Sequence, residues 1–305
     1  MLMASVIKAA YNLSGTLAAE VGLLSDLESL DMSNNTLSGS IPSSLGKLKK
    51  AIKVISLSDN RLTGSIPPEL SELFPLEKLL LFDNRLNGTV PFQLGFLGSM
   101  REFLIHNNEM SGTIPSKLGQ LGKDPYAVAV TGIDPPDNLR KISLSNNKLS
   151  GSIPPDFRSL GSNLTTLQLS NNRLTGTIPP ELIMLNGLQE IDLGGNLYIK
   201  GRIPTLLFSR LPNLRILNVS QNSLTGSIPS ISTPETSNLT SLDFHSNQFT
   251  GSIPEDTLYL LPRLQFLDIH DNPYLLGSLS LICTAQLADL KILVDDENIA
   301  CSCCS

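Results

Sequence analysis

Two aspartates and two histidines recur at matching positions near the C-terminal end of this 305-residue chain. Asp243 and His245 are separated by one residue, and Asp268 and His270 repeat the pair 25 residues later. Imidazole nitrogens and carboxylate oxygens bind divalent transition metals, and a nearby carboxylate favours the charged form of imidazole near pH 6. The four side chains could therefore hold a metal ion or form a pH-sensitive binding site. Plain polar surface is the alternative.

A third histidine, His106, stands among apolar residues at positions that elsewhere in the chain are mostly Ser, Asp or Gln. Its neighbours in this pattern are Leu80, Phe82 and Leu104. Exposed apolar side chains on an otherwise polar surface favour a contact with a partner, because aromatic anchors dominate binding energy. We therefore predict a ligand contact at these four residues, and packing beneath a neighbouring loop is the alternative.

All four cysteines lie in the last stretch of the chain, at Cys283, Cys301, Cys303 and Cys304. An even number confined to one end favours a terminal cap held by disulfides, which requires an oxidising compartment. Reduced thiols and a zinc site are the alternatives, although this spacing resembles no standard zinc site.

Motifs of catalysis are either absent from the sequence or explained by its repeats. Ser44 with Lys47, and Ser145 with Lys148, fit the Ser-x-x-Lys pattern of some serine hydrolases, but both pairs lie inside an ordinary repeat. The sequence contains no Gly-x-Ser-x-Gly elbow, phosphate-binding loop or His-Glu-x-x-His. We expect a chain that is not an enzyme and needs no cofactor.

Charge and hydropathy argue against a nucleic-acid partner and against a membrane span in this chain. The chain has 22 basic and 28 acidic residues and a formal net charge of −6, whereas a nucleic-acid surface needs clustered Lys and Arg. No stretch approaches the roughly 18 apolar residues of a membrane span. We predict no nucleic-acid partner and no membrane span in this chain.

These residues must be positioned by a phrase that the chain repeats, Leu-x-x-Leu-x-Leu-x-x-Asn-x-Leu-x-Gly-x-Ile-Pro. Its asparagine falls at Asn35, Asn60, Asn84, Asn108, Asn147, Asn172, Asn196, Asn222, Asn247 and Asn272. Successive copies are 24 to 26 residues apart, except for a step of 39 between Asn108 and Asn147. A period of about 20 to 29 residues is that of a leucine-rich repeat solenoid.

Each part of the phrase has a physical role. The Leu-x-Leu segment alternates apolar and polar residues, as at Leu167 and Leu169, and predicts a strand with one buried face. The Asn amide can satisfy backbone groups where the strand bends, so stacked repeats would form an Asn ladder. Gly and Ile-Pro predict an extended segment, and Leu-Gly-x-Leu a short helical turn. In such a stack His245 and His270 would lie about 4.8 Å apart, which is the interstrand spacing.

The predicted fold is therefore an α/β repeat, a right-handed solenoid with a parallel sheet on its concave face and short helical or 3-10 turns on its convex face. We predict a partial N-terminal repeat at residues 1–22, about ten repeats at 23–280 and a Cys-containing cap at 281–305. An insertion at 122–138, which includes Tyr126, could be a ligand contact or a tolerated surface loop. Because the chain starts in mid-repeat, we expect it to be a fragment.

The repeated phrase resembles that of plant-type leucine-rich repeat proteins over about nine tenths of the chain. That family includes receptor-kinase ectodomains, receptor-like proteins and secreted polygalacturonase inhibitors. The resemblance implies an extracellular or cell-surface protein that recognises ligands through its concave or lateral face. The tail, Cys301-Ser302-Cys303-Cys304, is similar to the ends of diatom leucine-rich repeat proteins. The paired-cysteine N-terminal cap of the family and a kinase domain are both absent from this sequence.

Three functions agree with these features. The first is a receptor-like module that binds a protein, peptide or glycan through its concave face and the insertion. The second is a secreted inhibitor of a wall-degrading hydrolase, and the third is a structural protein that binds ice or polysaccharide. Glycosylation sequons, in weak excess over chance, begin at Asn12, Asn34, Asn87, Asn163, Asn218 and Asn238.

Overall fold

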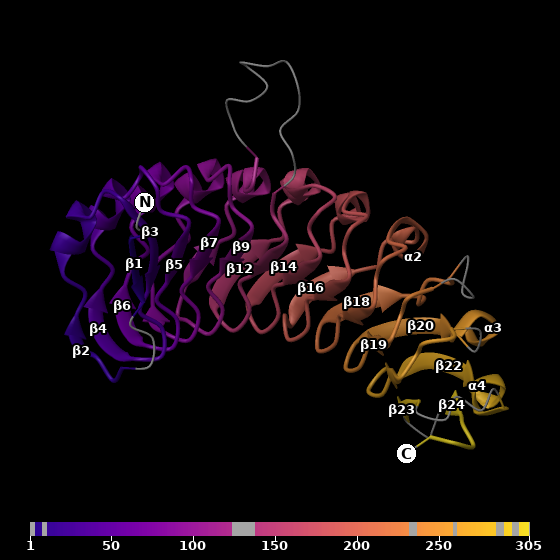
Figure 1. Cartoon of the computed structure of the whole chain (residues 1–305). Coiled ribbons are helices and arrows are strands. Elements are labelled where there is room, and N and C mark those ends of the chain that lie inside the picture. Colours follow the sequence, from indigo (N-terminus) through magenta and orange to yellow (C-terminus); the bar gives the residue numbers. More distant parts are fainter. Residues whose placement is uncertain are drawn as a thin grey trace, which may run out of the picture. The chain divides into compact units, whose positions relative to one another are not determined.

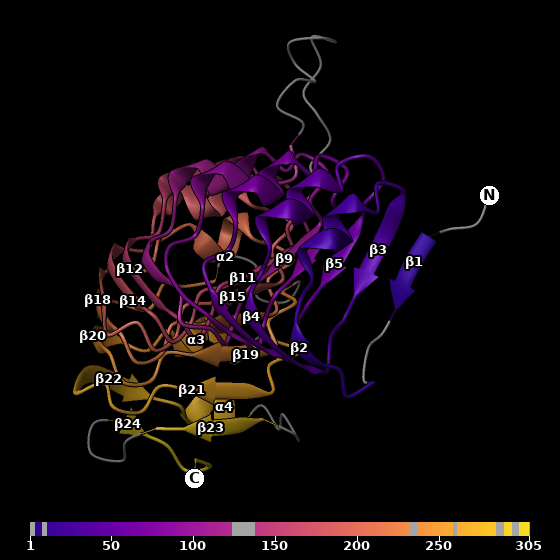
Figure 2. The same cartoon turned by 90° about the vertical axis from the view of Figure 1, so that its left-hand side faces the viewer.

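The structure, a computed structural model, describes residues 4–7, 11–123, 138–231, 237–258, 261–284, 290–294 and 299–304. The chain forms two compact units. Unit 1 consists of residues 1–150 and 156–164, and unit 2 consists of residues 151–155 and 165–305. Both units are built from parallel strands with short helical turns (Figure 1 and Figure 2). The sequence-based boundaries at residues 22 and 280 stay predictions.

The first sheet of unit 1 is parallel and has the strand order β1-β3-β5-β7-β9-β11. Its strands are β1 (Ala4–Ile7), β3 (Leu27–Asp31), β5 (Val54–Ser56), β7 (Lys78–Leu80), β9 (Glu102–Leu104) and β11 (Lys141–Ser143). From β3 onward each strand coincides with the Leu-x-Leu segment of one repeat, so apolar and polar faces alternate. Leu79 and Phe103 are fully buried, whereas Leu80 and Leu104 lie on the partly exposed face.

The first sheet of unit 2 continues the same plan in the order β13-β15-β17-β19-β21-β23. Its strands are β13 (Thr166–Gln168), β15 (Glu190–Asp192), β17 (Ile216–Asn218), β19 (Ser241–Asp243), β21 (Phe266–Asp268) and β23 (Lys291–Leu293). Buried Leu167 and Leu242 occupy the same inward position as Leu79 does in unit 1. Fully burying a side chain of this size stabilises a fold by about 1.5–3 kcal/mol, so these inward columns form the core.

A second set of parallel strands follows the Asn ladder, where the sequence predicted only an extended segment. In unit 1 these strands are β2 (Ser14–Thr16), β4 (Thr36–Ser40), β6 (Arg61–Gly64), β8 (Arg85–Leu86), β10 (Ser111–Thr113) and β12 (Lys148–Ser152). In unit 2 they are β14 (Arg173–Thr177), β16 (Tyr198–Gly201), β18 (Ser223–Gly226), β20 (Gln248–Ser252), β22 (Tyr274–Ser278) and β24 (Ile299–Ala300). These strands pair in parallel from repeat to repeat, although β8 and β10 are joined only by the isolated bridge between Thr89 and Ser111.

Short helical segments close most repeats, as the sequence predicted; between β18 and β19, residues 232–236 lie outside the described part of the chain. The helical segments are η1 (Ala19–Leu23), η2 (Ser43–Lys47), η3 (Pro68–Glu72), η4 (Phe92–Phe96), η5 (Ser116–Gln120), η6 (Pro155–Leu160), η7 (Pro180–Met184), α2 (Leu207–Arg210), α3 (Glu255–Leu258) and α4 (Ser280–Thr284), with η denoting 3-10 turns. Within the described ranges, none of the helices has the length and apolar character needed to cross a membrane. The predicted fold class, a leucine-rich solenoid with a parallel sheet and short turns, is confirmed.

The glycine of Leu-Gly-x-Leu is required by close packing between neighbouring turns. A Cβ atom on Gly46 would lie 2.5 Å from the carbonyl oxygen of Glu69 in the next turn. Because that neighbour is backbone, it cannot move aside as a flexible side chain would. The outer turns therefore stack at a distance that only glycine permits at this position.

The Asn side chains form a buried ladder between repeats. Asn108 Nδ2 donates to the Leu81 carbonyl of the preceding repeat at 3.0 Å and to its own Ile105 carbonyl at 3.1 Å. Its Oδ1 accepts a hydrogen bond from the Leu86 amide at 2.9 Å. One amide thus satisfies both donors and acceptors where the strand ends and the chain turns.

The residue before the ladder asparagine adopts a left-handed backbone conformation in most repeats. The φ angles are 54° at Asp59, 53° at Asp83 and 54° at Asn107. Asp and Asn tolerate this region better than other non-glycine residues, because their short side chains bond locally. This conformation explains why short polar residues fill the position.

The four cysteines are paired at the C-terminal end of unit 2. Cys283, in α4, forms a disulfide with Cys303, and Cys301 forms one with Cys304. The cap continues the solenoid, because β24 pairs in parallel with β22. With all four sulfurs in disulfides, none remains as the thiolate that zinc binding needs.

Candidate ligand-binding surface and histidine cluster

The structure brings together the four apolar and aromatic residues that the sequence singled out in unit 1. Leu80 in β7 and Leu104 in β9 are register partners. Two residues beyond them, the rings of Phe82 and His106 stack with centroids 4.6 Å apart and planes 5° from parallel. All four side chains are partly exposed. We call Leu80, Phe82, Leu104 and His106 the aromatic patch.

Backbone hydrogen bonds set the geometry of the aromatic patch. The Leu81 amide donates to the Leu104 carbonyl at 2.9 Å, and the Asp83 amide donates to the His106 carbonyl at 3.1 Å. Parallel pairing therefore continues past the strand ends, and it holds the two rings one interstrand spacing apart. The stack is a consequence of register, so a flat π-surface is already formed without a ligand.

Two buried polar atoms at the aromatic patch have no hydrogen-bond partner among the described residues. They are Nδ1 of His106 and Oγ of Ser143, and Ser143 is the register partner of Leu104 in β11. Leaving a buried donor or acceptor unsatisfied costs about 1–3 kcal/mol. A bound water or a polar group of a ligand would remove that cost.

Burial lowers the pKa of His106, and the carboxylates of Asp83 and Asp59 oppose that effect more weakly. The imidazole is therefore neutral at neutral pH, and one ring nitrogen accepts while the other donates. Around the patch the surface is polar: Lys78 and Glu102 form an ion pair at 2.7 Å on the same face. An apolar centre with a charged rim is the usual composition of a protein interface.

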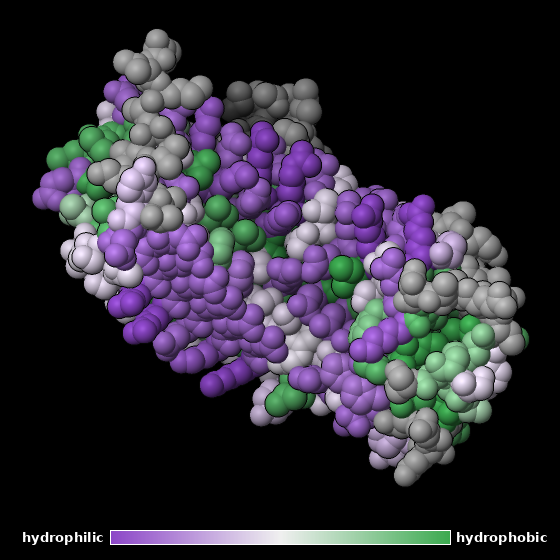
Figure 3. Space-filling model, turned by 60° about the horizontal axis from the view of Figure 1, so that its bottom comes forward, coloured by the Kyte–Doolittle hydropathy of each residue, from purple (hydrophilic) through white to green (hydrophobic). Residues whose placement is uncertain are grey.

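Strongly hydrophilic side chains cover the turns beyond the first sheet in regular rows (Figure 3). One residue past the stacked rings, Asn107 Nδ2 donates to Asp83 Oδ1 at 2.6 Å. This polar border makes the aromatic patch a local exception on its face of unit 1.

The insertion at 122–138 can be placed only by its ends, since Tyr126 and the rest of 124–137 lie outside the described residues. The Asn138 amide donates to the Gly122 carbonyl at 3.1 Å, so the insertion leaves and rejoins unit 1 at one point. That point precedes β11, whereas Phe82 and His106 follow their strands. The insertion is therefore anchored at the opposite end of the sheet from the stacked rings.

In unit 2 the register of β19 and β21 pairs Asp243 with Asp268. The rings of His245 and His270 stack with centroids 4.8 Å apart and planes 4° from parallel. Each Nδ1 lies beside its own aspartate, His245 at 2.6 Å from Asp243 Oδ1 and His270 at 2.5 Å from Asp268 Oδ1. We call these four residues the histidine cluster, and they form one contiguous arrangement.

The histidine cluster sits over a partly buried acidic row. Asp268 is only 4% exposed. Burial raises the pKa of Asp243 against the opposing hydrogen bond from His245, and burial likewise raises the pKa of Asp192 in β15. Carboxylates that are costly to ionise in place bind a cation or a charged imidazole more favourably than exposed ones do.

Two further residues contact the histidine cluster and escaped the sequence argument. Asp271 Oδ2 lies 3.5 Å from His270 Nε2, and Gln221 Nε2 lies 3.2 Å from His245 Nε2. Both occupy the left-handed position before the ladder asparagine, with φ of 54° and 50°. That shared motif position was the signal that could have identified them.

The second sheets carry a different pattern, with hydroxyl side chains on both sides of the motif glycine. In unit 1 these residues are Ser14, Thr16, Ser38, Ser40, Thr63, Ser65, Thr89, Ser111, Thr113 and Ser150. Adjacent rows repeat at about the 4.8 Å interstrand spacing. A groove of about 510 Å³ borders the rows and includes Phe92, which is 54% exposed.

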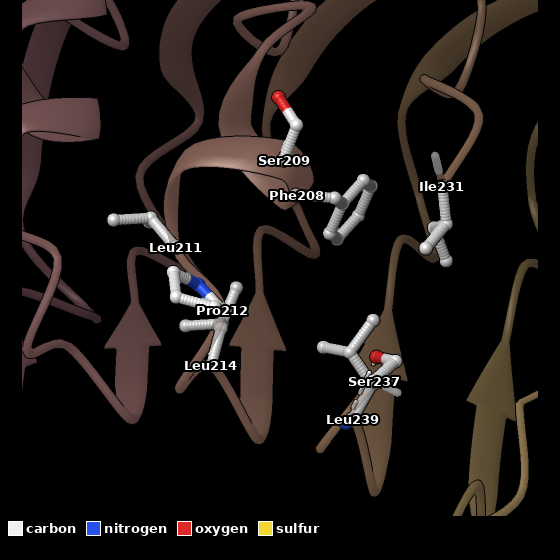
Figure 4. A pocket seen from close by; sticks show the side chains of 8 residues that line it. All are labelled: Phe208, Ser209, Leu211, Pro212, Leu214, Ile231, Ser237 and Leu239. Carbon is white, nitrogen blue, oxygen red and sulfur yellow. Dashed lines mark hydrogen bonds between the residues drawn. The ribbon is translucent and has the colours of Figure 1, made fainter. Parts of the chain in front are cut away.

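A cavity beside α2 in unit 2 is too small for a ligand. Its volume is about 40 Å³, and apolar side chains such as Phe208, Leu211 and Ile231 line it (Figure 4). A space of this size has room for little more than water. This cavity is a packing gap between the helix and the core.

Family models described as leucine rich repeat match residues 26–48, 51–73, 137–198 and 212–273, together more than half of the chain. Comparison with curated proteins gave no match. Solved structures do match, and the three reported below share 27–30% of residues with the chain.

A structure of PEPR1 with AtPEP1 is 30% identical, with a TM-score of 0.78, and the match covers 95% of this chain and 42% of that one. The Arabidopsis receptor kinase HAESA, solved with the peptide hormone IDA and the co-receptor SERK1, is 28% identical, with a TM-score of 0.71 over 97% of this chain and 53% of that one. A plant ice-binding protein is 27% identical, with a TM-score of 0.66 over 90% and 81%.

The chain spans about half the length of the two receptor chains. Both the receptors and the ice-binding protein share its parallel, repeating architecture. The repeated phrase, the buried Asn ladder and the family matches agree with one another. The chain belongs to the leucine-rich repeat family, and its repeats are of the plant type.

Proposed function

We propose that this chain is a non-enzymatic, receptor-like recognition module that binds a peptide or protein segment on the aromatic patch of unit 1. The observation that carries the proposal is the preformed Phe82–His106 stack beside two unsatisfied buried polar atoms. The stack offers apolar area, and a small rotation of each side chain would let His106 Nδ1 and Ser143 Oγ form hydrogen bonds to a ligand. A ligand that combines an apolar side chain with a nearby polar group would use both.

The comparisons support this proposal at the level of ligand class. RGFR1, a plant peptide hormone receptor solved with RGF2, matches with a TM-score of 0.73 and 28% identity, and HAESA was solved with a peptide hormone. Peptide binding and an extracellular location are properties of those proteins, and we propose both for this chain. Two disulfides at the C-terminal end of unit 2 agree with an oxidising location.

Photo-crosslinking tests the location of the proposed site. Peptides are selected from a random display library on the folded chain and then resynthesised with a photoreactive group. We expect mass spectrometry to map the attachment points to residues 78–106. Attachment spread evenly over both units, or confined to unit 2, would contradict the proposal.

Adsorption to ice is a second candidate, because a specific surface favours it. The hydroxyl rows of unit 1 are regular and exposed, and the plant ice-binding protein matches over 81% of its own length. A regular array of small hydroxyls could match a repeating lattice of water or sugar. Thermal hysteresis measures this activity: Thr63→Lys would abolish it, whereas Gln120→Lys on an outer turn would not. Zero hysteresis for the wild-type chain rules this candidate out.

A further inference from the structure

The histidine cluster fixes the tautomer of both imidazoles. Asp243 Oδ1 lies 2.6 Å from His245 Nδ1, and Asp268 Oδ1 lies 2.5 Å from His270 Nδ1. An ionised carboxylate only accepts hydrogen bonds, so each Nδ1 carries a proton. A neutral ring then has its lone pair on Nε2. Histidines that bind metals are oriented in this way, with the second nitrogen donating to a carboxylate.

Both Nε2 atoms have further polar groups within reach. Asp271 Oδ2 lies 3.5 Å from His270 Nε2, and the Gln221 amide lies 3.2 Å from His245 Nε2. Zinc binds imidazole nitrogen and carboxylate oxygen at about 2.0–2.2 Å, so ligand atoms in a tetrahedral site are about 3.3–3.6 Å apart. The separation of His270 Nε2 from Asp271 Oδ2 already meets that requirement.

The two rings must rotate out of their parallel stack to share a metal ion. Their centroids are 4.8 Å apart and their planes are 4° from parallel, so the in-plane lone pairs of the two Nε2 atoms lie side by side until the rings turn toward the ion. The His270 side chain is 35% exposed and that of Asp271 is 64% exposed, so an ion from solvent can reach both. Asp271 Oδ2 also accepts a hydrogen bond from Ser246 Oγ at 3.1 Å, which keeps the carboxylate turned toward the cluster.

We propose that His245 Nε2, His270 Nε2 and Asp271 bind one divalent transition-metal ion such as Zn²⁺, and that Asp243 and Asp268 orient the imidazoles. Three carboxylates around two neutral imidazoles give the cluster the negative charge that attracts a dication. Three protein ligands leave a fourth tetrahedral position, which water or a group from a partner would fill. The site lies in unit 2 and does not depend on ligand binding by the aromatic patch in unit 1.

Calorimetric titration of ZnCl₂ into the oxidised full-length chain at pH 7.5 tests the proposal. We expect one site, a raised melting temperature with Zn²⁺, and at least a tenfold loss of affinity in His245→Ala and in Asp271→Asn. His106→Ala is the matched control, because it removes a histidine from the same motif position in unit 1. Its affinity for Zn²⁺ should equal that of the wild-type chain.

Several results would overturn the proposal. They are absence of binding heat in the wild-type chain, equal loss in His106→Ala, and unchanged affinity in Asp271→Asn. The structure also places one donor atom each of His245, Asp268 and His270 within 4.8 Å of one another. Loss of binding in Asp268→Asn together with unchanged binding in Asp271→Asn would therefore assign the metal to that set instead. If His245→Ala does not fold, His245→Gln replaces it, and circular dichroism confirms that the variant used is folded.

Discussion

Phe82 and His106 lie face to face across two repeats, with ring centroids 4.6 Å apart and planes 5° from parallel. The stack joins residues 24 positions apart in sequence, and backbone register alone brings them together. Because the rings are aligned before any ligand binds, little side-chain entropy is lost on binding. The aromatic patch is therefore preorganised for binding.

Replacing His106 should affect folding stability and peptide affinity in different directions. In His106→Phe the ring stack remains, but a buried polar atom without a partner is lost. We expect stability in urea to be unchanged or to rise by up to about 1 kcal/mol, because the desolvation cost disappears. Affinity for a selected peptide should fall at the same time. A fall in stability of more than about 1 kcal/mol would mean that Nδ1 already has a partner.

The stability of the wild-type chain should depend on pH through His106. Its folded-state pKa is lowered by burial, so in the pH range between that value and about 6.5 the unfolded state binds more protons. Stability therefore decreases as pH falls from about 6.5 toward the folded pKa, and it is fully present above 6.5. Urea unfolding of the wild-type chain and His106→Phe between pH 5 and 7.5 measures the difference. If stability depended on pH in the same way in both proteins, the lowered pKa of His106 would be contradicted.

Loss of one ladder amide should be costly. Asn108→Ala leaves the buried amide of Leu86 without its partner, whereas the Leu81 carbonyl keeps its hydrogen bond from Asn84 Nδ2. An unsatisfied buried group costs about 1–3 kcal/mol, and we expect a destabilisation of roughly that size. Glu109→Ala, one residue later and exposed, is the matched control and should cost clearly less. Equal effects in urea unfolding would show that the ladder is not a major source of stability.

Glycine in the outer turn is expected to resist replacement. Gly46→Ala places a Cβ atom against the Glu69 carbonyl, and overpacking of this kind costs about 1–3 kcal/mol. Lys47→Ala, in the same turn but exposed, should change stability by less than about 0.5 kcal/mol. Thermal unfolding of the two variants gives the comparison, and a neutral Gly46→Ala would refute the packing argument.

The two disulfides should contribute unequally, because they close loops of different length. Cys283 and Cys303 are 20 residues apart, whereas Cys301 and Cys304 are three apart. By loop entropy, replacing the first pair with serines costs about 3 kcal/mol and replacing the second about 2 kcal/mol. Urea unfolding of the two double variants compares their losses of stability. A larger loss for the variant without Cys301 and Cys304 would contradict the prediction.

The sequence predicted the solenoid because each repeat uses the same local physics. Alternating leucines, one asparagine and one glycine recur often enough that their roles follow from spacing, and the inward Leu167 and the ladder Asn108 lie as predicted. The second sheet was missed because its x-Leu-x-Gly segments are too short and too polar to indicate strands. Those strands exist because the ladder aligns neighbouring backbones.

Details that depend on contacts between repeats escaped the sequence. Spacing placed His245 above His270, but the partners at Nε2 follow from the left-handed conformation of Gln221 and Asp271. Four cysteines allow three pairings, and only the fold selects Cys283 with Cys303. The unsatisfied Oγ of Ser143 has no signature in sequence at all, because serine is common in that column.

Binding of a selected peptide to Phe82→Ala tests the central claim most directly. Fluorescence anisotropy would compare the wild-type chain, Phe82→Ala and Phe92→Ala, whose phenylalanine is exposed on an outer turn of the same unit. We predict at least a tenfold weaker affinity for Phe82→Ala, equal affinity for Phe92→Ala, and the same melting temperature for all three. Equal affinity of the wild-type chain and Phe82→Ala would contradict the assignment of the aromatic patch as the ligand-binding surface.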